Sequence, residues 1–252
     1  MSNGHHDKKI DAFYAQEETV ESYDAIRFGN KGGRHVDQTE KEILVDFMKD
    51  HPIDLPVLEV AAGTGRFSLE LARRGYKVIA MDKSRPMLRM IQSLADKEGL
   101  DITCIEGDAF SLPFEDDAFE TVYSFRFVWH FRDYPKLISE FSRVSSNRVI
   151  FDMMNTWSLA SLSAPVANHI AYRSIHTETA SKADVLAAMS DVNLISKAER
   201  SAFVFPYIFY RHLPWLTPLF VGLEKIIFSI AKVGSINYFC AEKSPKRSSS
   251  LL

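Results

Sequence analysis

A glycine-containing turn and three carboxylates are the residues of this chain whose types and spacing could do chemistry. Residues 58–67 read LEVAAGTGRF, an apolar run that leads into Gly63 and Gly65 and then into a helical pattern. Glycine adopts backbone angles that other residues resist, and it lets a ligand lie directly against the main chain. In an open α/β sheet, such a turn lies at the carboxyl end of a strand, where ligands bind.

Acidic side chains lie near the ends of three successive predicted strands. Glu59 lies in the first strand, Asp82 closes the second and Asp108 closes the third. Asp82 is placed to accept hydrogen bonds from two ribose hydroxyls, and Asp108 to accept one from an adenine amine. Together they predict an electronegative rim that suits a positively charged nucleoside better than a pyrophosphate. Taken singly, Asp82 is equally typical of a helix N-terminus and Asp108 of a solvated loop.

The elements that must position these residues alternate between strands and helices. We expect strands at 56–60, 76–81, 102–105, 119–125 and 148–152, and helices at 66–74, 84–96 and 134–144. This alternation predicts a parallel sheet with right-handed crossovers. A helix at 181–190 and strands at 202–205 and 236–240 follow. The fold class is therefore α/β, with a doubly wound, mostly parallel seven-stranded sheet.

Two helices interrupted by glycines precede the sheet. The first carries Tyr23, Arg27 and Phe28, and the segment 29–33 reads GNKGG. We expect residues 1–50 to form a helical lid hinged at Gly32–Gly33, with a simple cap on a sheet edge as the alternative. Residues 51–243 form the main domain, with a late helical insertion around 206–233. The polar tail 244–252 is expected to be disordered.

The segment 215–231 is strongly apolar and predicts a helix. Glu224 and Lys225 lie in its middle and argue against a span across a membrane. We expect this helix to pack on the domain and wall an apolar acceptor pocket, with interfacial membrane binding as the alternative. Its predicted apolar face consists of Leu216, Leu219, Phe220, Leu223, Ile226, Ile227 and Ile230.

Composition excludes several classes of protein. The net charge of −3 lacks the basic surplus of proteins that coat nucleic acids, so no nucleic-acid partner is expected. The two cysteines form no zinc-binding spacing, and we predict no metal site. The polar N-terminus has no apolar run of the kind that a signal peptide needs. These features favour a soluble cytoplasmic protein.

From about residue 23 to residue 155, the chain resembles a class I S-adenosylmethionine-dependent methyltransferase of the small-molecule type. The resemblance is carried by the turn, the acids, the lid-like segment YDAIRF at 23–28 and the run LPFEDDAFE at 112–120. It implies that S-adenosyl-L-methionine is the cofactor. Ala61 replaces a common glycine, and Glu120 a frequent aspartate. The implied cofactor-binding residues are Glu59, Ala61, Gly63 and Gly65 for the methionine end, Asp82 for ribose, Asp108 and Ala109 for adenine, and Tyr23, Lys83, Met87 and Phe125 around them.

An aromatic segment at 124–131 follows the fourth predicted strand, on the sheet edge that faces the second substrate in doubly wound folds. Arg126 and His130 are the candidate catalytic residues. A neutral histidine near its ordinary pKa of about 6.5 can act as a general base. The alternative interpretation is that His130 is a structural histidine. The expected acceptor is a small or medium-sized molecule with an apolar part, or with a lipid part.

Two other functions compete with this interpretation. Gly63, Gly65 and Asp82 partly fit an NAD(P)-dependent oxidoreductase, but Ser68 occupies its third glycine position. No Tyr-x-x-x-Lys follows the fourth predicted strand either. The second alternative is a non-catalytic module that binds S-adenosylmethionine.

Overall fold

A seven-stranded sheet forms the centre of the protein in the computed structural model, which describes residues 17–158, 177–231 and 233–244. The strand order is β3-β2-β1-β4-β5-β7-β6, and only β7 runs antiparallel to its neighbours. The predicted doubly wound, mostly parallel sheet is thus confirmed. The strands are β1 (Val57–Val60), β2 (Val78–Asp82), β3 (Ile102–Glu106), β4 (Phe119–Ser124), β5 (Ser145–Met154), β6 (Leu194–Ala202) and β7 (Ile236–Lys243).

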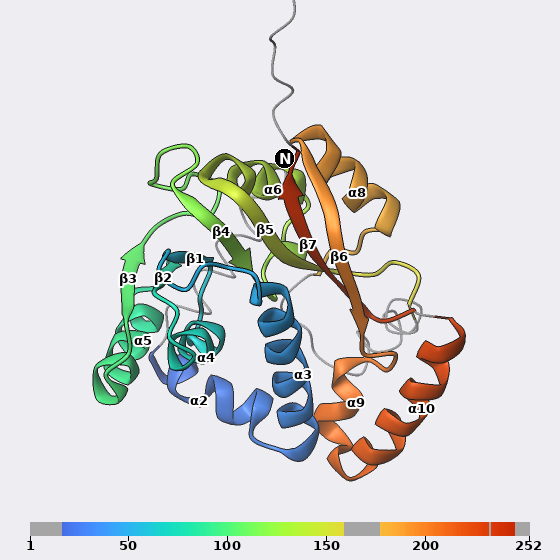
Figure 1. The fold of residues 1–252 in the computed structure, drawn as a ribbon. Coiled ribbons are helices and arrows are strands. Elements are labelled where there is room, and N and C mark those ends of the chain that lie inside the picture. The colour runs from blue at the N-terminus through green and yellow to red at the C-terminus, as the bar shows by residue number, and fades with distance from the viewer. Residues whose placement is uncertain (1–16, 159–176, 232, 245–252) are drawn as a thin grey trace, which may run out of the picture.

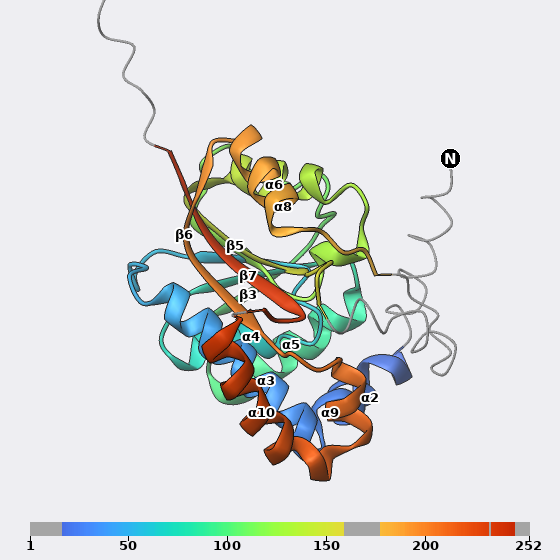
Figure 2. The same cartoon turned by 90° about the vertical axis from the view of Figure 1, so that its right-hand side faces the viewer.

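Helices cover both faces of this sheet. Helices α6 and α8 lie on one face, while α3, α4 and α5 lie on the other (Figures 1 and 2). The helices are α2 (Glu17–Phe28), α3 (Lys31–Met48), α4 (Arg66–Arg73), α5 (Arg85–Glu98), α6 (Tyr134–Val144), α8 (Lys182–Asp191), α9 (Tyr207–His212) and α10 (Thr217–Ile230), with short 3₁₀ turns η1 (Val128–His130) and η2 (Pro214–Leu216).

Local sequence explains where these elements form. All four residues of β1 are buried, as expected for a strand covered on both faces. Helix α5 begins after Ser84, whose hydroxyl accepts a hydrogen bond from the Met87 amide at 3.4 Å. Helix α8 begins with a capping box formed by Ser181 and Asp184. Both helices begin within one residue of their predicted starts at residues 84 and 181.

The predicted strand at 202–205 is wrong. The chain instead forms β6 over Leu194–Ala202, and Phe203 ends it with a left-handed φ of 60°. Strand β6 is the outermost strand, so one of its edges faces solvent and it tolerates charged residues. These residues are Lys197, Glu199 and Arg200. Such charges hide the apolar alternation by which strands are recognised.

The predicted hinge at Gly32–Gly33 is also wrong. Both glycines lie inside α3 and are buried, and the helix begins at Lys31 after its N-cap Asn30. A Cβ atom on Gly32 would lie 1.9 Å from the Tyr210 carbonyl oxygen, so only glycine allows α9 to approach α3 this closely. Residues 1–16 of the predicted lid and residues 245–252 of the predicted tail lie outside the described residues.

Helix α10 packs on the domain as predicted, but the predicted inward face of this helix is wrong. Its buried residues are Thr217, Phe220 and Glu224, whereas most of the predicted apolar face is exposed. The Glu224 carboxylate accepts hydrogen bonds from the Val204 amide at 2.6 Å and from the Tyr210 hydroxyl. These bonds offset the cost of burying the charge and determine which side of α10 faces the domain. Of the helices that the structure describes, none is long and apolar enough to cross a membrane.

Candidate functional site

A cavity of about 380 Å³ lies at the carboxyl ends of β1, β2, β3 and β4. This is where doubly wound sheets bind ligands, because the strand order reverses between β1 and β4. Every predicted site residue except Gly65 lines it. The predicted residues in its wall are Tyr23, Glu59, Ala61, Gly63, Asp82, Lys83, Met87, Asp108, Ala109, Phe125, Arg126 and His130.

Asp82 ties the turn after β1 to the end of β2. Its carboxylate accepts hydrogen bonds from the Gly63 amide and the Ser84 amide, each at 2.8 Å. The backbone of this turn is held in left-handed conformations, with φ of 59° at Ala61 and 78° at Gly65. Such angles are unfavourable for alanine and persist where surrounding structure imposes them, which is common at ligand sites.

Gly65 positions the cavity instead of lining it. It precedes α4, and a Cβ atom there would lie 2.7 Å from Cγ1 of Ile91 in α5. A side chain would therefore push α5 away, and α5 carries Met87 into the cavity wall. Its predicted contact with the cofactor stays a prediction.

Glu59 is a buried acid at the base of the cavity. Its carboxylate accepts hydrogen bonds from the Ser68 hydroxyl and, at 2.9 Å, from the Tyr123 hydroxyl. Burial raises the pKa of Glu59 to about 7, although these bonds and the charge of Arg66 act in the opposite direction. The cavity wall also contains the cations Arg66, Lys83 and Arg126, of which Lys83 and Arg126 were predicted and Arg66 was not.

The raised pKa of Glu59 predicts a stability that falls with pH. The folded state holds the proton to about pH 7, whereas the unfolded chain loses it near the ordinary value of 4.5. Glu59 therefore lowers the free energy of unfolding as pH rises from 4.5 to 7, by on the order of 3 kcal/mol in total. Urea unfolding of the wild type and of Glu59→Gln at pH 4.5 and pH 8 measures this. An equal pH dependence in both proteins would contradict it.

Glu40 of α3 joins two arginines behind the cavity wall. This fully buried carboxylate accepts hydrogen bonds from Arg126 Nη1 at 2.7 Å and from Arg66 Nη2 at 3.0 Å. The Tyr238 hydroxyl donates a third at 3.2 Å. The Arg66 guanidinium also stacks 3.8 Å from the centre of the Phe28 ring. Helix α3 is thereby fixed to α4, to the turn after β4 and to β7 by charge and hydrogen bonds.

The two predicted catalytic residues have different surroundings. The Arg126 guanidinium is held by Glu40, and its amide donates to Asp152 Oδ1 at 2.8 Å. Its left-handed φ of 61° turns the chain sharply at the end of β4. His130 lies in η1 and contributes to the cavity wall together with Phe131. Arg126 is therefore suited to shaping the wall, whereas His130 is suited to contacting a bound molecule.

Sequence reasoning missed Glu40, Arg66, Thr64 and Phe110. Arg66, Thr64 and Phe110 line the cavity, and each stands beside a residue that was predicted to do so. Their position next to Gly63, Gly65 and Ala109 could have indicated that they line the cavity. Glu40 had none, because its role depends on contacts with residues 26 and 86 positions away.

Comparison with known proteins finds a match for the middle of the chain. Residues 57–147 match a family model described as a methyltransferase domain. The demethylmenaquinone methyltransferase of Thermus thermophilus is 39% identical over 93 residues, which are 35% of this chain and 41% of that relative. The match thus spans less than half of that relative's length.

Solved structures extend the likeness to nearly the whole fold. Magnesium protoporphyrin IX methyltransferase from Synechocystis, with bound SAH, superposes with a TM-score of 0.70 at 14% identity. That match covers 94% of this chain and 100% of the other. The YcgJ protein of Bacillus subtilis superposes with a TM-score of 0.60 at 16% identity, and that match covers 82% of this chain and 99% of the other. Residues 57–147 are therefore similar to a methyltransferase domain, and the chain has the fold of solved methyltransferase structures.

Proposed function

We propose that this protein is an S-adenosylmethionine-dependent methyltransferase that acts on a small or medium-sized, partly apolar acceptor. The observation that carries the proposal is the cavity at the carboxyl ends of β1 to β4, where three acids meet an aromatic wall. The match of residues 57–147 to a methyltransferase domain supports it independently.

The cavity offers a complementary group for each part of the cofactor. Asp82, Asp108 and Ala109 line the cavity, where Asp82 would accept hydrogen bonds from the ribose hydroxyls and Asp108 with Ala109 would hold the adenine. The turn at Ala61 and Gly63 leaves the backbone open to the methionine end, near Glu59 and Arg66. When bound, the cofactor supplies a methyl group activated by a positively charged sulfur atom.

An aromatic cluster borders the side of the cavity assigned to the acceptor. The Phe131 ring packs against Phe110 at 5.1 Å and against Phe127 at 4.9 Å between ring centres. Rings at these distances form a continuous apolar surface, which favours an acceptor with an apolar part. The names of two similar proteins, which mention a menaquinone and a porphyrin, support this acceptor class.

The protein acts mainly by holding the two reactants in line. Orientation of this kind contributes about 7–11 kcal/mol in favourable systems. The aromatic cluster and α2, which contributes Tyr23 and Phe28, exclude water from between the reactants. His130 accepts a proton where the acceptor atom must lose one. We propose α2 as the cover of the site, without the hinge at Gly32–Gly33.

Ligand-induced stabilisation tests the choice of cofactor. S-Adenosylmethionine and S-adenosylhomocysteine should raise the melting temperature by about 5–10 °C at a hundredfold excess over Kd. A ligand that binds only the folded state stabilises it by mass action. NADH and NADPH serve as controls and should have no effect. Stabilisation by the nicotinamides alone would instead favour the oxidoreductase alternative.

Transfer of a labelled methyl group tests catalysis separately from binding. The wild type should label at least one member of a panel of quinones, porphyrins, isoprenoids and amines. His130→Ala should bind the cofactor as before and lose most of the transfer to acceptors that must be deprotonated. A protein that binds S-adenosylmethionine and labels nothing in the panel would be the non-catalytic module.

A further inference from the structure

Helix α10 and the turn before it expose a continuous row of large apolar side chains. We call Trp215, Leu219, Leu223, Ile226 and Ile230 the α10 ridge. Their exposed fractions lie between 39% for Leu223 and 81% for Ile230. Within α10, the spacing of four, three and four residues puts the ridge on one side of the helix. Exposed apolar rows of this kind mark interaction surfaces on folded proteins.

The ridge plays no part in holding α10 to the domain. That attachment uses Phe220 and Glu224, which lie on a different side of the helix, and the Phe220 ring packs 4.9 Å from Phe205. Figures 1 and 2 show α10 running along the outside of the molecule, next to α9 and α3. A folding requirement therefore does not explain why these positions are apolar.

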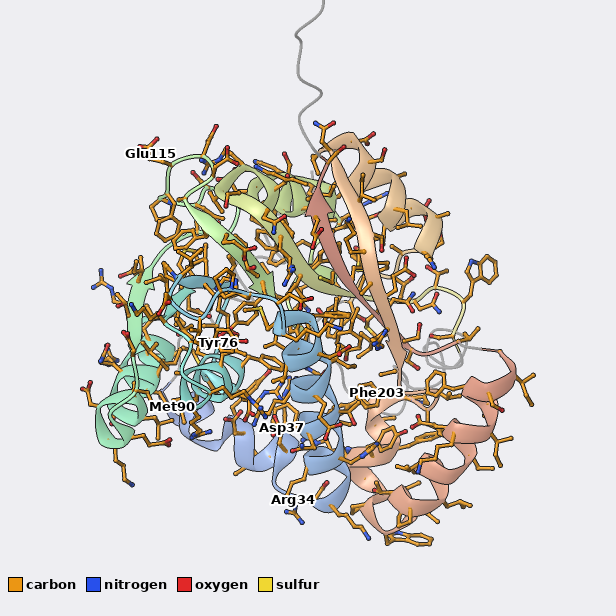
Figure 3. All side chains as sticks on the ribbon, viewed as in Figure 1. Arg34, Asp37, Tyr76, Met90, Glu115 and Phe203 are labelled. Atoms are coloured by element: carbon orange, nitrogen blue, oxygen red, sulfur yellow. The ribbon has the colours of Figure 1, made fainter. Side chains whose placement is uncertain are left out.

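Positive charge borders the ridge. A shallow groove between α10 and α3 is lined by Lys225, Lys31 and Arg34, among others. Arg34 lies on the end of α3 that approaches α9 and α10 (Figure 3). Residues 203–234 contain a single acidic residue, Glu224, and its carboxylate is buried against Val204 and Tyr210. This surface is thus cationic in a chain whose net charge is −3.

We propose that the α10 ridge docks this protein on the surface of an anionic lipid bilayer. An apolar helix face bordered by lysine and arginine lies in the interface, with its apolar side in the acyl boundary and its cations at the phosphates. Trp215, at one end of the ridge, is the side chain typical of that boundary. With 14 residues, α10 is too short to cross the bilayer.

The charge around the ridge favours a membrane over a second copy of this chain. In a twofold symmetric dimer, the same surface patch meets itself. Such a contact would bring together two copies of the same cationic border, which contains Lys225, Lys31 and Arg34, and this is unfavourable. Anionic phosphates offer the complementary charge instead.

Docking would also place the covered end of the cavity near the bilayer. Helix α9 lies between α10 and α2, and the Tyr207 hydroxyl of α9 donates to the Arg27 carbonyl of α2 at 2.5 Å. The Arg126 guanidinium, which lines the cavity, lies 5.1 Å from the Tyr207 ring centre. Access of a bilayer-dissolved acceptor to this end rests on the proposed function, whereas docking itself does not.

Co-sedimentation with vesicles tests the docking. The wild type should pellet with vesicles of 30% phosphatidylglycerol in phosphatidylcholine, and less with pure phosphatidylcholine or in 0.5 M NaCl. The triple variant Leu219→Ser, Ile226→Ser, Ile230→Ser should lower the partition coefficient at least tenfold. The matched control is Ile53→Ser, Leu55→Ser, Ile195→Ser, which changes three apolar residues that are 43–49% exposed near the amino ends of β1 and β6 and should bind like the wild type.

A variant with altered charge separates the electrostatic contribution to vesicle binding from the apolar contribution. Lys31→Glu with Lys225→Glu should reduce binding to anionic vesicles by about fivefold for each lysine lost, with little change for neutral vesicles. Glutamate at Lys31 is favourable for folding, because this residue begins α3 and acids stabilise helix N-termini. Unchanged circular dichroism and melting curves confirm that each variant is folded.

Two results would overturn the proposal. The first is a wild type that pellets equally with neutral and anionic vesicles, or with neither. The second is a ridge variant that dissociates a dimer, seen by analytical ultracentrifugation, and leaves vesicle binding unchanged. That second outcome would assign the ridge to a second copy of the chain. Neither result bears on cofactor binding or methyl transfer, so the proposed function is tested apart from this one.

Discussion

Glu40→Ala should lower the free energy of unfolding by about 3–5 kcal/mol, because removing one partner of a buried ion pair leaves the other charges uncompensated. Arg126 would lose the carboxylate 2.7 Å from its guanidinium, and Arg66 would keep only Asp37. For a domain of this size the loss corresponds to a fall in melting temperature of roughly 6–20 °C. Urea unfolding and thermal melting followed by circular dichroism measure both quantities.

Glu42→Ala is the matched control for this variant. It removes an acid from the same helix, but Glu42 accepts only a hydrogen bond from the Gln38 side chain on the surface. Its loss should change the free energy of unfolding by less than about 0.5 kcal/mol. Equal, small effects of both substitutions would mean that the Glu40 cluster does not hold α3 to the sheet.

Asp82→Ala should weaken the binding of S-adenosylhomocysteine by about two to four orders of magnitude. Each hydrogen bond to a charged group contributes about 1.5–3 kcal/mol, and the ribose would lose two. The variant also releases the Gly63 amide, to which the carboxylate is bonded at 2.8 Å, so the turn after β1 loses its anchor. Isothermal titration calorimetry measures the affinity of each protein.

Two companion variants make the result specific. Asp82→Asn keeps an oxygen that can accept from Gly63, so it should preserve the turn and lose a smaller part of the affinity. Glu106→Gln removes an exposed acid from the end of the neighbouring strand, where it pairs with Arg85, and should bind like the wild type. Wild-type affinity in Asp82→Ala would remove this residue from the proposed ribose site.

The sheet and the cavity were predictable because their signals are local. Strand β1, the glycine turn and Asp82 lie within about 25 residues, and each obeys a rule of sequence spacing. Parallel strands then bring their carboxyl ends together without further information. Twelve predicted side chains or backbone positions met at one cavity for that reason.

The errors arose where a distant partner decided the structure. Nothing near Glu224 in the sequence indicates that Val204 and Tyr210 donate hydrogen bonds to its carboxylate. The prediction therefore relied on the amphipathic pattern and turned the apolar side of the helix inward. Likewise, Gly32 resembles a hinge until the Tyr210 backbone is known to press against it. Both cases involve α9, a six-residue helix with no periodic pattern from which its position could be predicted.

The place of β7 in the sheet bears on how the chain folds during synthesis. Strand β7 lies between β5 and β6, so β6 is translated about 40 residues before the strand with which it pairs. Until β7 has been synthesised, β6 has no strand in the sheet with which to pair. Its charged residues, including Lys197 and Arg200, disfavour pairing of this unpaired strand with other nascent chains. Charge on β6 therefore protects the protein before folding as well as after it.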